Sequence, residues 1–222
     1  MVARPSASRA NLMSRDHILH KIRTVLGRSA GQPPAEAPPV RLRVPEADVE
    51  ARIETFLASV SRLNGKTHRA HSCEEVRDYA ARLLDGRRAV ASNAAVLRDC
   101  GITCLPGVEC GFSDRGALQA ACARAEFGIT GADYALADTG TVVLLASATE
   151  ARMISLLPPV HLAVVRKESI LTGLDELFAL LPRPSEITSA AVLITGPSRT
   201  ADIEQILVRG VHGPGEIHVV VL

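Results

Sequence analysis

Apolar residues recur at helical spacing through much of the first half of the chain. The spacing predicts five helices, which cover residues 14–26, 46–64, 72–86, 94–101 and 115–128. Ser14 is a typical capping residue for the first helix, and Ser72 and Glu75 have the spacing of a capping box at the start of the third. The intervening segments are expected to be strands or extended chain, over residues 66–71, 88–92 and 102–107.

The pattern changes after Gly128. Residues 127–147 are rich in glycine and β-branched side chains, and residues 160–166 and 190–196 are continuous apolar runs, typical of strands buried on both faces. Two more helices and a last strand are expected over residues 169–182, 200–210 and 216–222. Strands that alternate with helices indicate an α/β fold with a mostly parallel sheet.

A proline-rich segment separates the first helix from the rest of the chain. We expect residues 1–27 to form a tail and an amphipathic helix, and residues 28–45 to form a semi-rigid extended linker. Residues 46–222 are then the main α/β domain.

Composition argues against several classes of function. The 222 residues include 25 basic and 24 acidic side chains, a formal net charge of +1, which is not typical of a protein that binds nucleic acid by neutralising phosphates. Aromatic residues make up only 3% of the chain, so a base-stacking surface is not expected. No apolar run reaches the ~20 residues that a membrane-spanning helix needs. The odd number of cysteines and the lack of a secretory signal favour a reducing, cytoplasmic location.

The segment from Gly196 to Thr200 follows an expected strand and precedes an expected helix. Such a turn presents free backbone N–H groups and the positive end of the helix dipole, to which Arg199 adds a charged fork. Gly196, Ser198, Arg199, Thr200 and Asp202 therefore form a candidate site for a phosphate or carboxylate at the end of a strand. The alternative is a well-capped helix in which Arg199 is solvated or paired with Asp202. The segment matches neither a Walker loop nor a dinucleotide fingerprint.

His212 and Gly213 lie in a second unusual segment, a turn of glycine and proline residues. An imidazole in such a turn can bind a ligand or transfer a proton. The alternative is a turn histidine that hydrogen-bonds to the backbone.

Asp138, Thr139, Gly140 and Thr141 interrupt an otherwise apolar segment. Polar groups in such a place need partners or face a cleft, and an acid there can act as a nucleophile or base. The alternative is a hairpin turn or a β-bulge, with Asp138 as the turn residue.

The cysteines do not predict a metal site. Cys100, Cys104 and Cys110 have neither zinc-site nor cluster-binding spacing, and we interpret them as ordinary buried or loop thiols. Cys73 and Cys122 fall within expected helices and are interpreted as structural.

Four segments together resemble the lactate utilization protein C family (LutC/YkgG), whose members contain a LUD domain. In chain order they are ITGADYALADTGTVVL, LLPPVHLAVV, GPSRTADIEQILVRGVHGP and EIHVVVL. The resemblance implies a three-layer α/β/α fold with a mostly parallel sheet, similar to the NagB/RpiA/CoA-transferase group. The family often has glutamate where this chain has Asp138. In the related CoA transferases a glutamate near a similar position attacks the acyl-CoA. Because aspartate is one methylene shorter, the resemblance does not carry this covalent role over.

The resemblance also implies a function. The chain would be a subunit of an L-lactate-oxidising system, beside two iron–sulfur protein subunits that hold the clusters, and would bind no cofactor itself. From the residue segments themselves we expect Ser198, Arg199 and Thr200 to hold a small anion at the carboxyl edge of the sheet. Asp138 and His212, the candidate catalytic residues, would close in on it from neighbouring strand ends. The alternatives are a stand-alone enzyme of the CoA-transferase-like fold that binds a CoA ester or nucleotide, and a purely structural scaffold.

Overall fold

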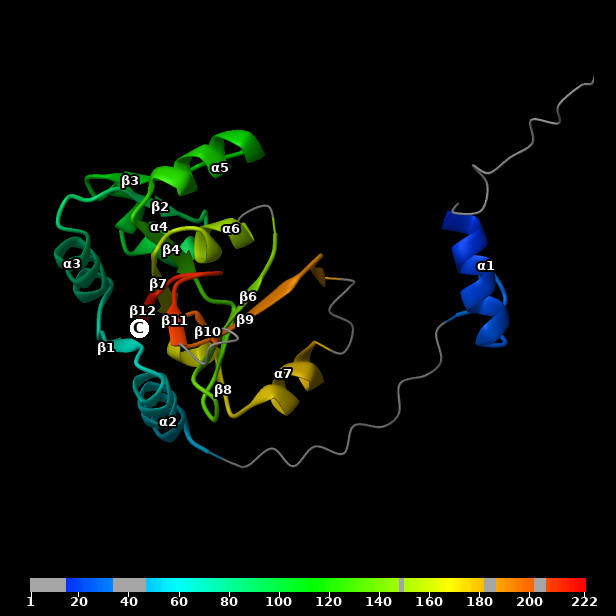
Figure 1. Ribbon diagram of the computed structural model, residues 1–222. Helices are drawn as coiled ribbons and strands as arrows, with labels where there is room; N and C mark the ends of the chain where they lie inside the picture. Colours follow the sequence, from blue (N-terminus) through cyan, green and yellow to red (C-terminus); the bar gives the residue numbers. More distant parts are fainter. Residues whose placement is uncertain (1–14, 34–46, 148–149, 182–186, 202–206) are drawn as a thin grey trace, which may run out of the picture. The chain divides into compact units, whose positions relative to one another are not determined.

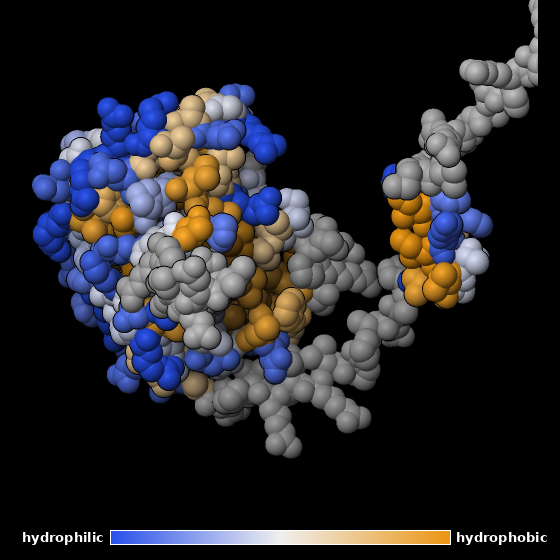
Figure 2. Space-filling model, in the orientation of Figure 1, coloured by the Kyte–Doolittle hydropathy of each residue, from blue (hydrophilic) through white to orange (hydrophobic). Residues whose placement is uncertain are grey.

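The chain divides into two units, Met1–Arg41 and Leu42–Leu222. The computed structural model describes residues 15–33, 47–147, 150–181, 187–201 and 207–222. In the first unit, α1 (Arg15–Val25) is the expected N-terminal helix, and none of its residues is buried. Its apolar side chains remain exposed along one side of the helix (Figure 2). No helix within the described ranges is both long and apolar enough to cross a membrane.

The second unit is built on a six-stranded sheet in which every neighbouring pair of strands is parallel. In spatial order its strands are β1 (Lys66–Arg69), β12 (Glu216–Val221), β7 (Val160–Val165), β4 (Phe127–Gly131), β2 (Ala89–Ala91) and β3 (Val108–Glu109). The central strands are almost entirely buried, which explains their continuous apolar sequences.

Helices cover both faces of this sheet, so the fold has the three layers implied by the resemblance (Figure 1). Leu162 and Val164 of β7 pack with α3 (Cys73–Leu84) and α4 (Ala95–Asp99), whereas Ala163 and Val165 pack with α2 (Val49–Arg62) on the opposite face. The other helices of the second face are α5 (Arg115–Arg124) and α6 (Arg152–Leu156). Ser72 Oγ accepts a hydrogen bond from the Glu75 N–H, which confirms the predicted cap of α3.

A smaller four-stranded sheet packs against α2. Its strand order is β8 (Ile170–Leu171), β5 (Tyr134–Leu136), β6 (Thr141–Leu145) and β9 (Ala191–Thr195). Apolar side chains of the sheet that do not pack with α2 form a second cluster, to which α7 (Leu174–Leu180) contributes. Only β5 and β8 are parallel in this sheet. Figure 2 shows apolar surface on the face where this sheet and α7 lie. Leu193 of β9 and Phe178 of α7 are exposed apolar side chains.

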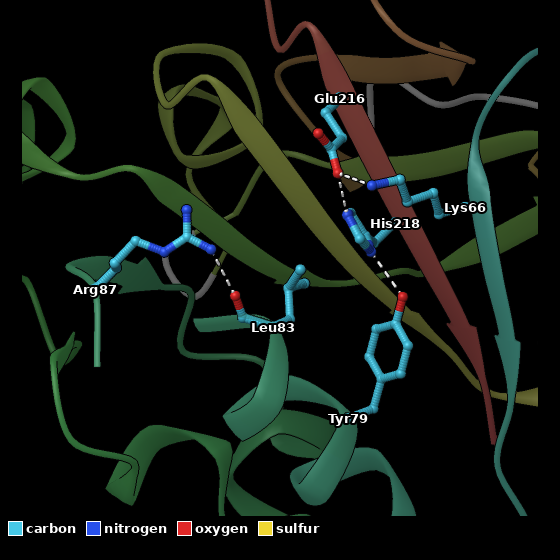
Figure 3. Close-up of polar contacts among 6 residues, drawn as sticks. All are labelled: Lys66, Tyr79, Leu83, Arg87, Glu216 and His218. Carbon is cyan, nitrogen blue, oxygen red and sulfur yellow. Dashed lines mark hydrogen bonds and ion pairs between the residues drawn. The ribbon is translucent and has the colours of Figure 1, made fainter. Parts of the chain in front are cut away.

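A chain of polar side chains joins α3 to the first strands of the main sheet (Figure 3). The Tyr79 hydroxyl lies 2.7 Å from His218 Nδ1, and His218 Nε2 lies 2.7 Å from Glu216 Oε1. Lys66 Nζ also donates to that carboxylate oxygen, at 2.6 Å. Burial lowers the pKa of His218, and the Glu216 carboxylate opposes this effect.

The predicted helix over residues 200–210 is wrong. The segment instead begins and ends with the antiparallel strands β10 (Arg199–Ala201) and β11 (Leu207–Arg209), while residues 202–206 lie outside the described ranges. Short apolar runs do not distinguish a helix from a strand by spacing alone. Here the Ser198 carbonyl accepts from the Gly210 N–H at 3.1 Å, so backbone groups pair across the segment. Gly210 has a positive φ of 78°, but it caps no helix.

Three smaller expectations also need correction. Residues 102–104 form a 3₁₀ helix, η1 (Ile102–Cys104), rather than extended chain, and the helix expected over 169–182 is shortened by η2 (Lys167–Ser169) and β8. The run around β9 is not buried on both faces, because β9 lies at the end of the smaller sheet and its side chains alternate between exposed and half-buried.

Candidate functional site

A cavity of about 470 Å³ brings together two of the unusual segments, the turn 196–199 and the turn 212–214. The end of α2, α6, β9 and the first residues of β7 and β12 complete its wall. Its polar lining consists of Ser155, His161, Thr195, Ser198, Arg199 and His212. Its apolar lining includes Leu63, Leu156, Val192, Ile194 and Ile217. The wall is therefore mixed, with an apolar body and a few polar groups, as in many small-molecule sites.

The cavity lies at the amino edge of the main sheet, not at the carboxyl edge where the sequence predicted the cleft. His161 and Ile217 are the second residues of β7 and β12, and Pro214 precedes β12. The prediction was wrong because it placed residues 190–196 in the main parallel sheet. That strand is β9 of the smaller sheet, so its end points to a different part of the molecule.

The turn 196–199 packs against Leu63, the residue that caps the C-terminus of α2. Gly196 has a positive φ of 75°, and a Cβ there would fall 3.0 Å from Leu63 Cβ, so the position suits glycine. Arg199 donates from Nη2 to the Leu63 carbonyl oxygen at 2.5 Å. A cation is favourable near a helix C-terminus, so this contact orients Arg199 at the cavity wall.

The turn 212–214 packs directly on the first turn. The Ser198 N–H donates to the Pro214 carbonyl at 2.8 Å, and a Cβ on Gly213 would lie 3.4 Å from Ser198 Cβ. His212 lines the cavity and is exposed to solvent. The structure therefore places Gly196, Ser198, Arg199, His212 and Gly213 together, as the sequence predicted. The side chain of Thr200 and the whole of Asp202 lie outside what the structure describes.

His161 was missed by sequence reasoning. Its side chain is fully buried, and Nε2 lies 2.8 Å from the Thr130 hydroxyl oxygen. Burial lowers the pKa of His161 to about 4, so the imidazole is neutral at physiological pH. Its Nδ1 has no hydrogen-bond partner among the described residues. The signal was a lone histidine in the apolar strand sequence VHLAVV.

The segment 138–141 forms the turn of the β5–β6 hairpin, which is the structural alternative considered for it. Gly140 has a φ of 66°, and a Cβ there would fall 2.6 Å from Val60 N, so the turn packs closely on α2. Thr141 Oγ1 lies 2.8 Å from Thr139 Oγ1 and 2.7 Å from the Thr195 hydroxyl, so Thr139 and Thr141 connect to the cavity through Thr195.

Asp138 does not line this cavity. A Cβ added to Gly173 would lie 2.7 Å from Asp138 Oδ2, which places the carboxylate against the segment between β8 and α7. The expectation that Asp138 and His212 close on one ligand is therefore not met by the lining of the cavity. Ser59 Oγ donates to the Asp138 carbonyl oxygen at 3.3 Å, a contact that fixes the turn.

A second cavity, of about 240 Å³, lies at the carboxyl edge of the main sheet. Its lining includes Asp133 after β4, Arg166 after β7, the start of α4, and Glu150. Glu150 is only 6% exposed, and its Oε1 has no hydrogen-bond partner among the described residues. Burial raises the pKa of Glu150 to about 8; a hydrogen bond from Ser92 opposes this shift and the Asp133 charge adds to it.

Sequence reasoning missed this acid pair as well. Asp133 lies two residues after the end of buried strand β4, where ligand groups of parallel sheets lie, so its position carried a signal. The position of Glu150 carried no such signal. Among the described residues, no group of three or more histidine, cysteine or acidic side chains is placed to hold a metal ion.

The profile of the LUD domain family matches residues 53–222. The protein YkgG of Escherichia coli K12, described as uncharacterized, is 31% identical over 218 residues, which cover 90% of this chain and 94% of that protein. The chain belongs to the LUD domain family. This confirms the resemblance to LutC/YkgG proteins that the four sequence segments indicated.

Other relatives of this LUD domain protein match over a shorter stretch. Lactate utilization protein C of Halalkalibacterium halodurans is 42% identical over 95 residues, and that of Macrococcus caseolyticus is 43% identical over 95 residues. The matched stretch spans 41% of this chain and 41% of each relative. The fold is similar to a crystal structure of a DUF162 family protein from Deinococcus radiodurans. The TM-score is 0.62 at 22% identity, over 79% of this chain and 99% of that one.

Proposed function

We propose that this protein acts in lactate utilization, as the subunit without clusters of an L-lactate-oxidising iron–sulfur system. The names of the lactate utilization protein C relatives support the pathway. Two iron–sulfur protein subunits would hold the redox centres and carry the electrons. This chain would contribute the LUD domain, with a binding site for a small anion.

The observation that carries the ligand proposal is the convergence of the turns 196–199 and 212–214 on one cavity. Arg199 provides the positive charge that a carboxylate would need. Among the described residues, its guanidinium group has one hydrogen bond, from Nη2 to the Leu63 carbonyl, and a guanidinium carries five N–H donors. The remaining donors can form a forked contact with a carboxylate, the geometry in which arginine binds such groups most strongly.

The other polar groups suit a small hydroxy or oxo acid. The Thr195 and Ser198 hydroxyls each can donate or accept, and His212 adds a ring that can do both. His161 stays neutral on the inner wall, with one ring nitrogen already beside Thr130. The apolar side chains that line the rest of the cavity match the small apolar part of such a ligand. At about 470 Å³ the cavity is within the range of small-molecule sites.

Purification from cells tests the assembly. A tagged copy of the protein, isolated anaerobically from cells grown on lactate, should carry two iron–sulfur proteins in fixed ratio. Deletion of the gene, in a strain without another lactate dehydrogenase, should abolish growth on lactate. Recovery of the tagged protein alone, together with normal growth of the deletion strain, would refute membership in the system.

Thermal unfolding tests the ligand site separately. L-lactate or pyruvate at about ten times its Kd should stabilise the protein by about 1.4 kcal/mol, a rise in Tm of roughly 3–6 °C. Arg199→Ala should remove this rise, whereas Arg115→Ala, which removes an exposed arginine of α5, should keep it. An equal rise in Arg199→Ala would place the ligand elsewhere. A rise with a CoA ester or nucleotide alone would favour the stand-alone enzyme.

A further inference from the structure

Two thiols that are far apart in sequence meet on the face of the sheet opposite α2. Cys73 is the first residue of α3, and Cys100 follows the last residue of α4. Their Sγ atoms lie 2.6 Å apart although the residues are separated by 27 positions. Both are free thiols. This separation is closer than two non-bonded sulfur atoms normally approach, and a disulfide bond of about 2.05 Å needs only a small further movement.

The two thiols differ in access. Cys73 is partly exposed at the start of α3, whereas Cys100, at the end of α4, is only 3% exposed. Burial and the neighbouring Cys73 thiol raise the pKa of Cys100 to about 12, so Cys100 remains protonated under physiological conditions. A soluble oxidant therefore reaches Cys73 first, and Cys100 lies in position to react second.

We propose that Cys73 and Cys100 form a reversible redox-active pair, a modification site that takes a low-molecular-weight disulfide such as oxidised glutathione as its oxidant. The Cys73 thiolate attacks one sulfur of glutathione disulfide, and one glutathione leaves as its thiolate. Cys100 then attacks the Cys73 sulfur, and its proton passes to the second glutathione as that leaves. The two protein thiols are oxidised by two electrons, and one glutathione disulfide is reduced to two glutathione molecules.

The cross-link would fix α4 to α3. The residues that begin α4 line the smaller cavity, and Asp99 at its end forms an ion pair with Arg166 at 2.7 Å. Oxidation therefore restrains one wall of the cavity that contains Glu150 and Asp133, without changing any residue that lines it. The oxidation state of the thiol pair is therefore structurally linked to a cavity of the same domain.

The pair is separable from the other three cysteines. Cys104 and Cys110 are exposed and can be replaced by serine in the full chain, and Cys122 is buried away from them in the cluster of α5 and α6. The experiment uses the Cys104→Ser/Cys110→Ser protein, equilibrated with oxidised and reduced glutathione at defined ratios. Denatured samples are then titrated for free thiols and mapped by peptide mass spectrometry.

We expect the number of free thiols to fall from three to one, with a Cys73–Cys100 cross-linked peptide. Closure of this loop should raise Tm by roughly 5–10 °C, and dithiothreitol should reverse the rise. Cys100→Ala in the same background should stop at a mixed disulfide with glutathione on Cys73. Three free thiols at millimolar oxidised glutathione, or a stable glutathione adduct on Cys73 while Cys100 is present, would overturn the proposal.

Discussion

Replacement of Glu150 by glutamine should stabilise the protein at alkaline pH. The Glu150 carboxyl group is buried beside Asp133, and its pKa is raised from 4.5 to about 8. In the unfolded chain the same group ionises near its ordinary value. Between these two pH values unfolding releases a proton, so the stability that the protonated group contributes is lost as pH rises. Glutamine has a similar shape and cannot ionise, so Glu150→Gln removes this loss.

The magnitude follows from the shift. A pKa that moves from 4.5 to about 8 corresponds to roughly 5 kcal/mol across the full range, at about 1.4 kcal/mol for each tenfold change in the ionisation constant. Below pH 4.5 the wild-type protein and the variant should have similar stability. At pH 9 the variant should be more stable by several kcal/mol, a large part of the free energy of unfolding of a typical domain.

Urea unfolding followed by circular dichroism at pH 5, 7 and 9 measures this difference. Glu54→Gln is the matched control, because Glu54 is exposed on α2, and its effect should stay within ±0.5 kcal/mol at all three pH values. A Glu150→Gln effect that does not increase between pH 5 and pH 9 would refute the reasoning. So would a wild-type protein that is the more stable of the two at pH 9.

Three further predictions concern other parts of the fold. Because the pKa of buried His161 is lowered to about 4, stability should fall as pH drops from 6.5 towards 4, and His161→Gln should weaken this dependence in urea unfolding. Gly140→Ala should cost about 2–4 kcal/mol, since it combines a positive φ with a backbone contact at 2.6 Å, whereas Gly86→Ala, which has the positive φ and open space, should cost less. Tyr79→Phe should cost about 1 kcal/mol through loss of the hydrogen bond to His218, measured in the same assay at pH 7.5.

Much of the main sheet could be predicted, because local signals there agree with the final packing. The capping spacing of Ser72 and Glu75 marks the start of α3, and the apolar sequence of β7 matches a strand covered on both faces. The fold class followed from this alternation of elements. Sequence spacing gave the wrong secondary structure where contacts between distant residues determine it, as in the segment that begins with β10. There the backbone of Ser198 pairs with Gly210 and Pro214, which no local pattern records.

The candidate site was predicted in part for the same reason. The turns around Ser198 and His212 carry special residues in the sequence, and the structure brings them together. Asp138 looked similar locally, but its hairpin turns its carboxylate towards Gly173. The thiol pair of Cys73 and Cys100 could not be predicted, because one residue begins a helix and the other follows a different helix.

The two cavities lie at opposite ends of strand β7. A polar group in each cavity lowers the free energy of unfolding, but over a different pH range. His161 near the start of β7 stays neutral and shares a hydrogen bond with Thr130, so its lowered pKa reduces stability only as pH falls below 6.5. Glu150, which lines the cavity beyond the end of β7, costs stability through the whole neutral range, because its burial opposes ionisation and its Oε1 has no hydrogen-bond partner among the described residues. Parallel sheets bind ligands at their carboxyl edge, and function commonly accounts for groups that reduce stability. Growth on lactate of a strain that carries Glu150→Gln therefore tests whether the Glu150 carboxyl group is needed for function. A stabilised protein that supports growth makes Glu150 dispensable, and a stabilised protein that does not support growth gives the carboxyl-edge cavity a role in function.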